Sequence, residues 1–289
     1  MKIEIPEALK ADVPQNKWGK LLTSTPIVMT VIATMLAGLS SSEMTRAQYD
    51  RSLAAQQQSK AGDQWGFFQA KKLRGAMQRS TLDLLEGTTE VHPFSGGQLA
   101  PPVIAALEKS ELPTAPPGPP LDPGVQAALA ALEGQKSESD IAALLLPVKE
   151  TTLGEALRIA TDATLALDAA TRPVNQAIEQ LEKSPGDRPL GRDFIAARLR
   201  YTAKRYDAEA RLNQAVAFVY ELQVRKSNVS AEHHHARSQR FFYGMLAAQM
   251  AVIIATFAIA ARQKNLLWSI AAAAGLAAVT LAVYVYLFV

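Results

Sequence analysis

The C-terminal part of the chain reads MLAAQMAVIIATFAIAA, RQKN and LLWSIAAAAGLAAVTLAVYVYLFV (residues 245–261, 262–265 and 266–289). Two apolar runs without a charged residue are thus separated by four polar residues, two of which are basic. Each run is about as long as a helix needs to be to cross a hydrocarbon core of ~30 Å. The pattern predicts a hairpin of two membrane-spanning helices joined by a tight basic turn.

A third charge-free run, LLTSTPIVMTVIATMLAGL, lies at residues 21–39. Lys17, Trp18 and Lys20 precede it, and a Trp between lysines is typical of the edge of a membrane. A secretory signal peptide has a similar layout, with a charged start and small residues after the apolar stretch. Because two further apolar runs follow, we expect a retained membrane span, with a signal peptide as the alternative.

The overall composition narrows the class of protein. Apolar residues make up 48% of the 289 residues and charged residues 20%, and the mean hydropathy is +0.02. The concentration of the apolar residues in three runs excludes a simple soluble enzyme. The net charge of +3 is too small to indicate nucleic acid as a partner. Since the chain has no cysteine, it can form no disulfide, zinc–thiolate site, iron–sulfur cluster or cysteine nucleophile.

Helical patterns fill most of the remaining sequence. Residues 43–85 lack proline and carry apolar side chains at three- and four-residue spacings, which predicts one long helix. Residues 192–240 lack proline and glycine, so a second long helix should run without a break into the apolar run that follows. Nine of the 16 prolines lie between residues 87 and 124. They exclude a continuous helix there and favour a polyproline-type connector or a cover over the helices.

Shorter helices are expected between the two long ones, at residues 103–111, 125–132, 139–146 and 152–183. Ser137 or Ser139 should cap the third of them, and Thr151 or Thr152 the fourth. Pro173 should kink or split the fourth helix. The sequence SPGD at residues 184–187 predicts a turn after it.

We therefore expect an all-α fold, namely an integral membrane protein with three transmembrane helices and a long extramembrane helical hairpin or coiled coil. The expected segments are a polar N-terminal segment (1–20), transmembrane helix 1 (21–42), a long helix (43–86), a Pro/Gly-rich connector (87–124), a helical insert (125–186), a long amphipathic helix (187–240), transmembrane helix 2 (241–261), a basic turn (262–265) and transmembrane helix 3 (266–289).

The distribution of positive charge predicts the topology. Short basic loops such as residues 262–265 stay in the cytoplasm. This places the N-terminus in the cytoplasm of a bacterial inner (cytoplasmic) membrane and residues 43–240 in the periplasm. Basic residues before the second span favour the reverse orientation, but long domains are translocated largely regardless of their charge. Those residues are Arg225, Lys226, Arg237 and Arg240.

The three expected spans contain no Asp, Glu, Lys, Arg or His, which argues against a coupled transporter. In the first span, Thr30, Thr34 and Gly38 recur every four residues, and small residues at this spacing let helix backbones approach closely. Three uses of this face are open: packing of the spans within one chain, packing between subunits, and the lining of a hydroxyl-lined passage.

His233, His234 and His235 are weak candidates for a metal site. Consecutive positions on a helix point about 100° apart, so three adjacent imidazoles cannot all reach one ion. We expect structural or headgroup-facing roles for them and no bound metal. The chain also lacks nucleotide-binding, hydrolase and metalloprotease motifs, so we expect neither an enzyme nor a cofactor.

The stretch DQWGFFQAKK at residues 63–72 combines three aromatic side chains with polar neighbours. The aromatic residues are too large and apolar to be left in water along one helix, and the polar residues fit the rim of a helix–helix contact. We interpret the stretch as an assembly feature whose members are Asp63, Gln64, Trp65, Phe67, Phe68, Gln69 and Lys71.

The same stretch resembles a D-Q-W-x-aromatic-aromatic-Q-A-K signature of an uncharacterised bacterial membrane-protein family, a domain of unknown function. The sequence NKW at residues 16–18 is similar to the entry into the first span of that family. The resemblance implies one N-terminal span, a helical middle and a C-terminal hairpin of spans, and it implies no activity.

The leading functional hypothesis is a non-enzymatic membrane scaffold or accessory subunit that self-associates through its helical stalk and transmembrane helices. The alternative is an oligomeric channel or pore lined by transmembrane helix 1. The expected partners are the lipid bilayer, further copies of the chain and another membrane complex, but not nucleic acid.

Overall fold

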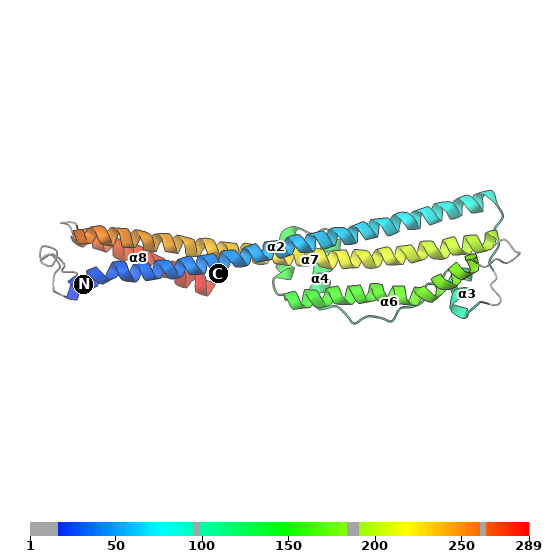
Figure 1. Ribbon diagram of the computed structural model, residues 1–289, viewed down its shortest axis with the longest axis horizontal. Coiled ribbons are helices and arrows are strands. Elements are labelled where there is room, and N and C mark those ends of the chain that lie inside the picture. The colour runs from blue at the N-terminus through cyan, green and yellow to red at the C-terminus, as the bar shows by residue number, and fades with distance from the viewer. Residues whose placement is uncertain (1–16, 95–98, 184–190, 261–263, 289) are drawn as a thin grey trace, which may run out of the picture. The chain divides into compact units, whose positions relative to one another are not determined.

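The computed structural model describes residues 17–94, 99–183, 191–260 and 264–288 (Figure 1). All regular structure within these ranges is α-helical, which confirms the all-α prediction. The helices are α2 (Lys17–Thr88), α3 (Pro101–Glu108), α4 (Pro123–Glu133), α5 (Glu138–Leu145), α6 (Glu150–Lys183), α7 (Arg192–Ala260) and α8 (Lys264–Phe288).

The chain divides into two compact units, and the long helices α2 and α7 contribute to both. Unit 1 contains the residues up to Ser52 and those from Asn228 onward, and unit 2 contains Leu53–Ser227. The continuity of α7 confirms the prediction that residues 192–240 run without a break into the second apolar run. The physical reason is the absence of proline and glycine from residues 192–240, since these two residues most destabilise a helix interior.

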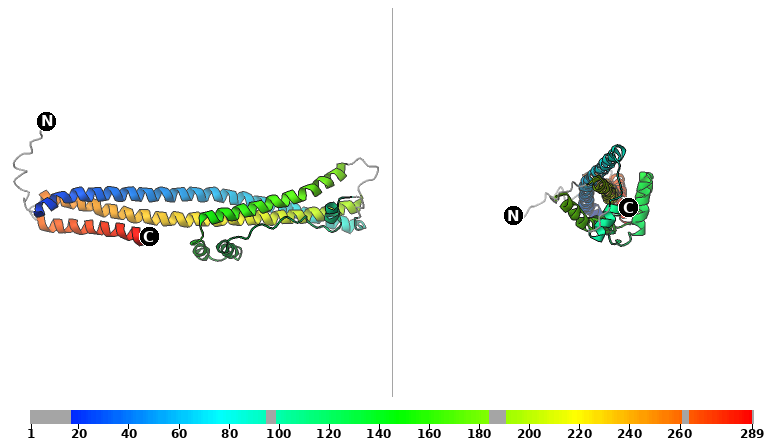
Figure 2. Two further views of the ribbon diagram at one scale, coloured as in Figure 1. Left: turned by 90° about the horizontal axis from the view of Figure 1, so that it is seen from below. Right: turned by 90° about the vertical axis from the view of Figure 1, so that its right-hand side faces the viewer.

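Unit 1 is built from the N-terminal part of α2, the C-terminal part of α7 and α8, which pack side by side (Figures 1 and 2). Gly244 is packed so closely that an added Cβ atom would lie 3.3 Å from Leu36 Cδ1. Small residues thus let the three helices approach one another closely. The core of the unit consists of Ala33, Leu36, Phe241, Ala248, Ala278 and Val285.

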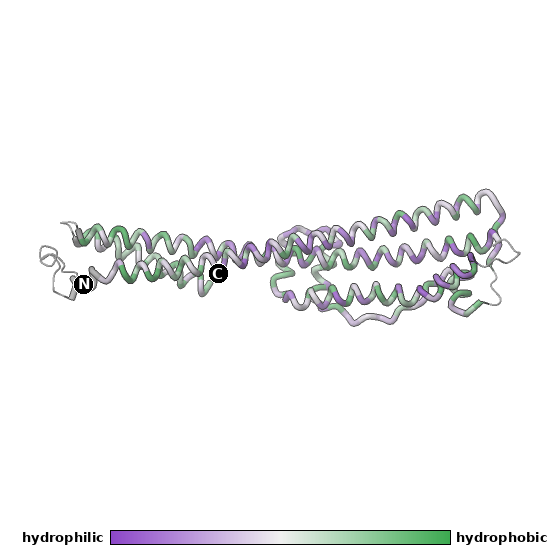
Figure 3. Tube along the Cα trace, viewed as in Figure 1, coloured by the Kyte–Doolittle hydropathy of each residue, from purple (hydrophilic) through white to green (hydrophobic). Residues whose placement is uncertain are grey.

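Large apolar side chains cover the outer surface of unit 1. Figure 3 shows hydrophobic residues concentrated along its three helices, and Ile27, Phe257 and Leu276 are among the exposed ones. Three helical stretches, one in each of α2, α7 and α8, are long and apolar enough to cross a membrane. These stretches coincide with the three runs that the sequence analysis selected.

Unit 2 packs its shorter helices against α7. One apolar cluster joins α4, α5 and α6 to α7 and includes Ile141, Leu153 and Leu222. A second cluster joins α3 and α6 to α7 and includes Leu107 and Tyr201. Because α6 contributes to both clusters, it lies along α7 over most of its length.

The starts of the short helices follow from local hydrogen bonds. Ser137 accepts a bond from the Asp140 N–H at 3.2 Å and caps α5, so it is Ser137 and not Ser139 that fills this role. The expected cap of α6 at Thr151 or Thr152 is wrong. The carbonyl of Lys149 already accepts the first bonds of that helix, and both threonines lie inside its first turn.

Helix α6 continues through Pro173 as one helix from Glu150 to Lys183. Its ribbon bends towards its C-terminal end in Figure 1, so the expected kink is present as a bend and the helix is not split. The turn expected at residues 184–187 lies outside the described residues.

The proline-rich connector between α3 and α4 lies against the helices at several points, four of which are three residues apart. Leu112, Pro113, Ala115 and Leu121 are half-buried, and a Cβ added to the exposed Gly118 would lie 3.7 Å from Ile159 Cγ2. Leu112 packs on one apolar cluster of unit 2 and Leu121 on the other. A period of three is that of a polyproline II helix, whose every third residue faces the same side.

Candidate functional site

The aromatic stretch of α2 makes its main contact through Trp65. The indole Nε1 donates a hydrogen bond to Glu221 Oε1 at 2.7 Å. The Phe68 and Phe218 rings meet the indole edge-on, with centroid distances of 5.4 and 5.3 Å. This geometry is favourable for aromatic pairs, and the polar end of the indole is satisfied as well. Trp65 and Phe68 therefore join α2 to α7 within unit 2.

Ion pairs continue this contact along the two helices. The ammonium group of Lys71 bonds to Glu209, and Arg205 Nε lies 3.3 Å from the same carboxylate. Further along, Arg79 donates to Asp207 at 2.5 Å. Pairs with this much solvent access contribute only about 0–1 kcal/mol each. These ion pairs therefore contribute more to the alignment of α2 on α7 than to the stability of the contact.

The remaining members of the aromatic stretch differ in their exposure. Gln64 is half-buried, and Asp63 and Gln69 are exposed. Phe67 is 55% exposed, so the expectation that all three aromatic residues pack in one contact does not hold within the chain. The reason is rotation: Phe67 is one residue before Phe68 and therefore points about 100° away from it.

An apolar stripe lies on the outward side of α2. Leu73, Met77 and Leu84 are 63%, 59% and 68% exposed, and their spacings of four and seven residues keep them on one side of the helix. We call Leu73, Met77 and Leu84 the outer stripe. Phe67 points about 80–120° away from this stripe and lies on a further exposed side of α2. In unit 2, helix α2 thus has an apolar face that packs on α7 and an apolar stripe that the described residues leave exposed.

The three adjacent histidines of unit 1 do not converge. His234 Nδ1 lies 2.6 Å from Glu43 Oε2, whereas His235 Nε2 accepts a bond from Gln239 at 3.0 Å. The His233 ring touches only the edge of the His234 ring, at 5.9 Å between centroids. Among the described residues, no group of three His, Cys, Asp or Glu side chains is arranged to hold a metal ion.

Glu43 is the buried centre of this cluster, with only 7% of its surface exposed. Besides His234, it has Arg46 and Arg237 as partners, each with a guanidinium nitrogen 3.7 Å from Oε1. A buried carboxylate needs such partners because its desolvation is costly. The pKa of His233 is lowered, first by partial burial and then by the positive charges of Arg237 and His234.

The face with Thr30, Thr34 and Gly38 is exposed, and an open groove, not a packed contact, lies between the two threonines and α7. The Thr30 hydroxyl donates to the carbonyl of Pro26 at 2.8 Å, and the Thr34 hydroxyl donates to that of Thr30 at 2.9 Å. Nothing lies within 4 Å of a Cβ added to Gly38. The contact inside the chain is made instead by Ala33 and Leu36, which lie on a different side of the same turns of α2. Packing between subunits and the lining of a passage, the other two uses expected for this face, stay predictions.

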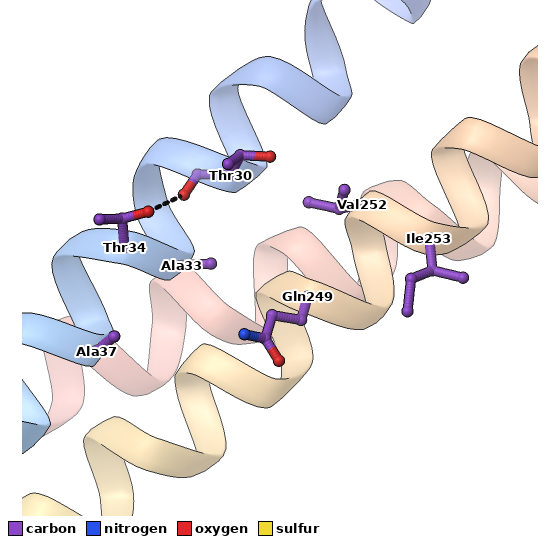
Figure 4. A pocket seen from close by; sticks show the side chains of 7 residues that line it. All are labelled: Thr30, Ala33, Thr34, Ala37, Gln249, Val252 and Ile253. Carbon is purple, nitrogen blue, oxygen red and sulfur yellow. Dashed lines mark hydrogen bonds between the residues drawn. The ribbon is translucent and has the colours of Figure 1, made fainter.

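A groove runs beside these threonines in unit 1 (Figure 4). It has a volume of about 440 Å³, and its lining combines small and branched apolar side chains with three polar ones. The amide of Gln249 reaches into the region between α2 and α7, and no hydrogen bond joins it to the other six residues drawn in Figure 4. The lining residues are Thr30, Ala33, Thr34, Ala37, Gln249, Val252 and Ile253.

Sequence reasoning did not select Glu43, Glu221 or Gln249. Glu43 is the first charged residue after the first apolar run, and Gln249 is an amide inside the second, so each had a signal in its position. Glu221 had none, because its role depends on the alignment of α2 with α7.

Comparison with known proteins finds a similar domain family but indicates no activity. No curated protein and no solved structure matches the chain. Residues 22–107 match a family described as a domain of unknown function (DUF4337). The matched range begins in the first apolar run, includes the aromatic stretch and ends in α3. A domain similar to DUF4337 is therefore found at residues 22–107, which is consistent with an uncharacterised family.

Proposed function

We propose that the chain is a non-enzymatic membrane scaffold or accessory subunit, anchored by three transmembrane helices and self-associating through its helical stalk. The observation that carries this proposal is the outward position of two sets of apolar side chains. One set covers unit 1, where a bilayer would surround it. The other is the outer stripe of α2 in unit 2, which has no partner in the described part of this chain.

Aromatic residues at one end of unit 1 support membrane insertion. Phe242 and Tyr243 on α7 are exposed, as are Tyr284, Tyr286 and Phe288 on α8. Arg240 lies over the Tyr284 ring, 5.8 Å from its centroid, which brings the two helices together at this level. Aromatic side chains beside basic ones are typical of the membrane–water interface. We place the outer boundary of the bilayer at this belt.

The proposed location is the bacterial inner membrane, with the N-terminus in the cytoplasm and unit 2 in the periplasm. The argument is the basic sequence between α7 and α8, of which residues 262 and 263 lie outside the described residues. The belt of aromatic residues is compatible with this orientation, since such belts occur at both interfaces.

Self-association through the outer stripe is tested by placing a charge on it. Met77→Glu should shift the protein to a smaller size in mild detergent, because a carboxylate in a helix–helix contact is desolvated. Ala76→Glu is the matched control: it adds the same charge one residue away, at an exposed position on another side of α2. Equal sizes of wild type and Met77→Glu would contradict self-association through the stalk.

A second candidate function, an oligomeric channel, is favoured by the polar groove of unit 1. Thr30, Thr34 and Gln249 give the mostly apolar lining of this groove three polar side chains. Several copies around an axis could enclose such faces in a wetted passage. Ion flux into liposomes that contain the purified protein would support the channel, and its loss in Gln249→Leu would assign the passage to this groove.

A further inference from the structure

Arg240, at the edge of the proposed membrane span, forms no ion pair with a carboxylate among the described residues. It precedes Phe241, the first residue of the second expected span. Its guanidinium lies over the Tyr284 ring, 5.8 Å from the ring centroid. Across from it on α2 stand the uncharged residues around Ser40, and α8 carries no carboxylate at all.

Arg240 shares a helix face with Arg237 and His233, which lie three and seven residues before it. Arg237 has one guanidinium nitrogen 3.7 Å from Glu43, while its Nε is buried without a hydrogen-bond partner. Glu43 is already shared with His234 and Arg46. One carboxylate therefore faces two guanidinium groups and an imidazole, and Arg240 adds a further positive charge.

The electrostatic environment of His233 is consistent with a positive surface. The pKa of His233 is lowered by burial and by the charges of Arg237, His234 and Arg240, and Glu43 opposes this shift without cancelling it. The two remaining carboxylates of this region lie away from the bilayer edge: Asp50 is two turns beyond Glu43 on α2, and Glu232 is two turns before Arg240 on α7.

We propose that Arg240 and Arg237 bind the phosphate of an anionic phospholipid. The site rests on the membrane insertion that we propose above, because only that insertion brings headgroups to the level of Arg240. A guanidinium offers paired N–H donors that match the oxygens of a phosphate, and the Arg237 side chain keeps 23% of its surface exposed for such a contact. The neighbouring aromatic belt of α7 and α8 would contact the glycerol and the upper acyl chains.

The charge of the site selects among phospholipids. Phosphatidylcholine carries a choline cation that neutralises the charge of its phosphate. At this site the cation would lie near two arginines, which is electrostatically unfavourable. A phosphatidylglycerol has a net negative charge and no such cation. Binding should therefore favour phosphatidylglycerol and weaken as salt screens the exposed part of the interaction.

The experiment uses the full chain in mild detergent, with short-chain lipids titrated and binding followed by native mass spectrometry. Dioctanoyl phosphatidylglycerol should bind about fivefold more tightly than dioctanoyl phosphatidylcholine, the size expected for one basic residue at a membrane surface. Arg240→Gln should abolish this preference, and Arg240→Lys should keep most of it because the charge is retained. Arg51→Gln, which removes an exposed arginine elsewhere in unit 1, should leave it unchanged.

Three results would overturn the proposal: equal binding of the two lipids, an equal effect of Arg51→Gln and Arg240→Gln, or inorganic phosphate binding as tightly as the lipid. Alkaline carbonate extraction of membranes tests insertion separately. A chain that stays in the membrane but shows no lipid preference contradicts the headgroup site alone, whereas a chain that is extracted contradicts the proposed function itself.

Discussion

Ser40 on α2 and Ser238 on α7 hold each other through reciprocal hydrogen bonds. The Ser40 hydroxyl donates to the carbonyl of Ser238 at 3.0 Å, and the Ser238 hydroxyl donates to that of Ser40 at 2.8 Å. The two hydroxyl oxygens are 3.2 Å apart. Only small side chains allow two helix backbones to come this close, so the pair marks a point of tight contact within unit 1.

The serine pair predicts a measurable coupling between the two residues. Ser40→Ala and Ser238→Ala should each lower the free energy of unfolding by about 0.5–1.5 kcal/mol, the net worth of a typical hydrogen bond. Their effects should be non-additive by about 0.6 kcal/mol, the average found for such pairs in membranes. A double-mutant cycle in detergent, followed by thermal unfolding, measures both values. Strict additivity would mean that the two hydroxyls do not interact.

The ring packing of Trp65 and its hydrogen bond to Glu221 should contribute different amounts to the stability of unit 2. Trp65→Ala together with Phe68→Ala should loosen α2 from α7 in unit 2, because large truncations of aromatic residues at packed sites cost about 3–5 kcal/mol. Trp65→Phe keeps a ring but removes the donor to Glu221, which should cost only about 1–3 kcal/mol. Limited proteolysis and thermal unfolding measure the stability of each variant, and Trp65→Phe should be more stable than the double variant.

Phe67→Ala is the control for the Trp65 variants. It removes an aromatic ring from the same stretch, but one that is exposed within the chain, so the stability of unit 2 should change by no more than about 0.5 kcal/mol. If Phe67→Ala reduces the oligomer while unit 2 stays stable, the exposed side of α2 that carries Phe67 is an assembly surface in addition to the outer stripe. If it destabilises unit 2 as much as Trp65→Ala does, the assignment of the two faces of α2 is wrong.

The helices were predictable from the sequence because their signals are local. The uninterrupted pattern from residue 192 to 240 predicts the continuity of α7, and charge-free runs of sufficient length predict the three candidate spans. The cluster of prolines likewise predicts the connector between α3 and α4.

The rotation of the helices and the pairs between them were not predictable in the same way. Helix α2 carries apolar residues on two sides, so their spacing alone did not reveal that Trp65 faces α7 and Phe67 does not. For the same reason the small residues at Thr30 and Thr34 looked suited to internal packing, while Ala33 makes the contact. Each pairing depends on the alignment of two segments more than 150 residues apart, which no local pattern contains.

The pKa of His233 predicts how acid affects unit 1. Burial and the nearby cations lower this pKa below its ordinary value of 6.5, so the unfolded chain binds a proton at His233 more readily than the folded chain does. The stability that His233 contributes is therefore complete above about pH 6.5 and is lost as the pH falls below it. His233→Gln should reduce this acid sensitivity, as measured by thermal unfolding between pH 7.5 and 5.

Arg240→Gln provides the complementary measurement. Since the charge of Arg240 contributes to the lowered pKa, its removal should raise the pKa of His233 towards the ordinary value, as followed by NMR titration of the imidazole protons. Arg51→Gln should leave that pKa unchanged. An unchanged pKa in Arg240→Gln would show that Arg240 does not share the face of His233.

The orientation of the chain can be read directly, because the sequence contains no cysteine. Ala127 is an exposed position of α4 in unit 2, so Ala127→Cys should tolerate the change and present its thiol to solvent. With unit 2 in the periplasm, a membrane-impermeant thiol reagent should label this cysteine in intact Gram-negative cells whose outer membrane has been permeabilised. Glu4→Cys, near the N-terminus that we place in the cytoplasm, should react only after the inner membrane is lysed. The reverse pattern would put unit 2 in the cytoplasm. In that case the basic residues before the second span would follow the positive-inside rule, and the anionic lipids that Arg240 meets would be those of the cytoplasmic leaflet.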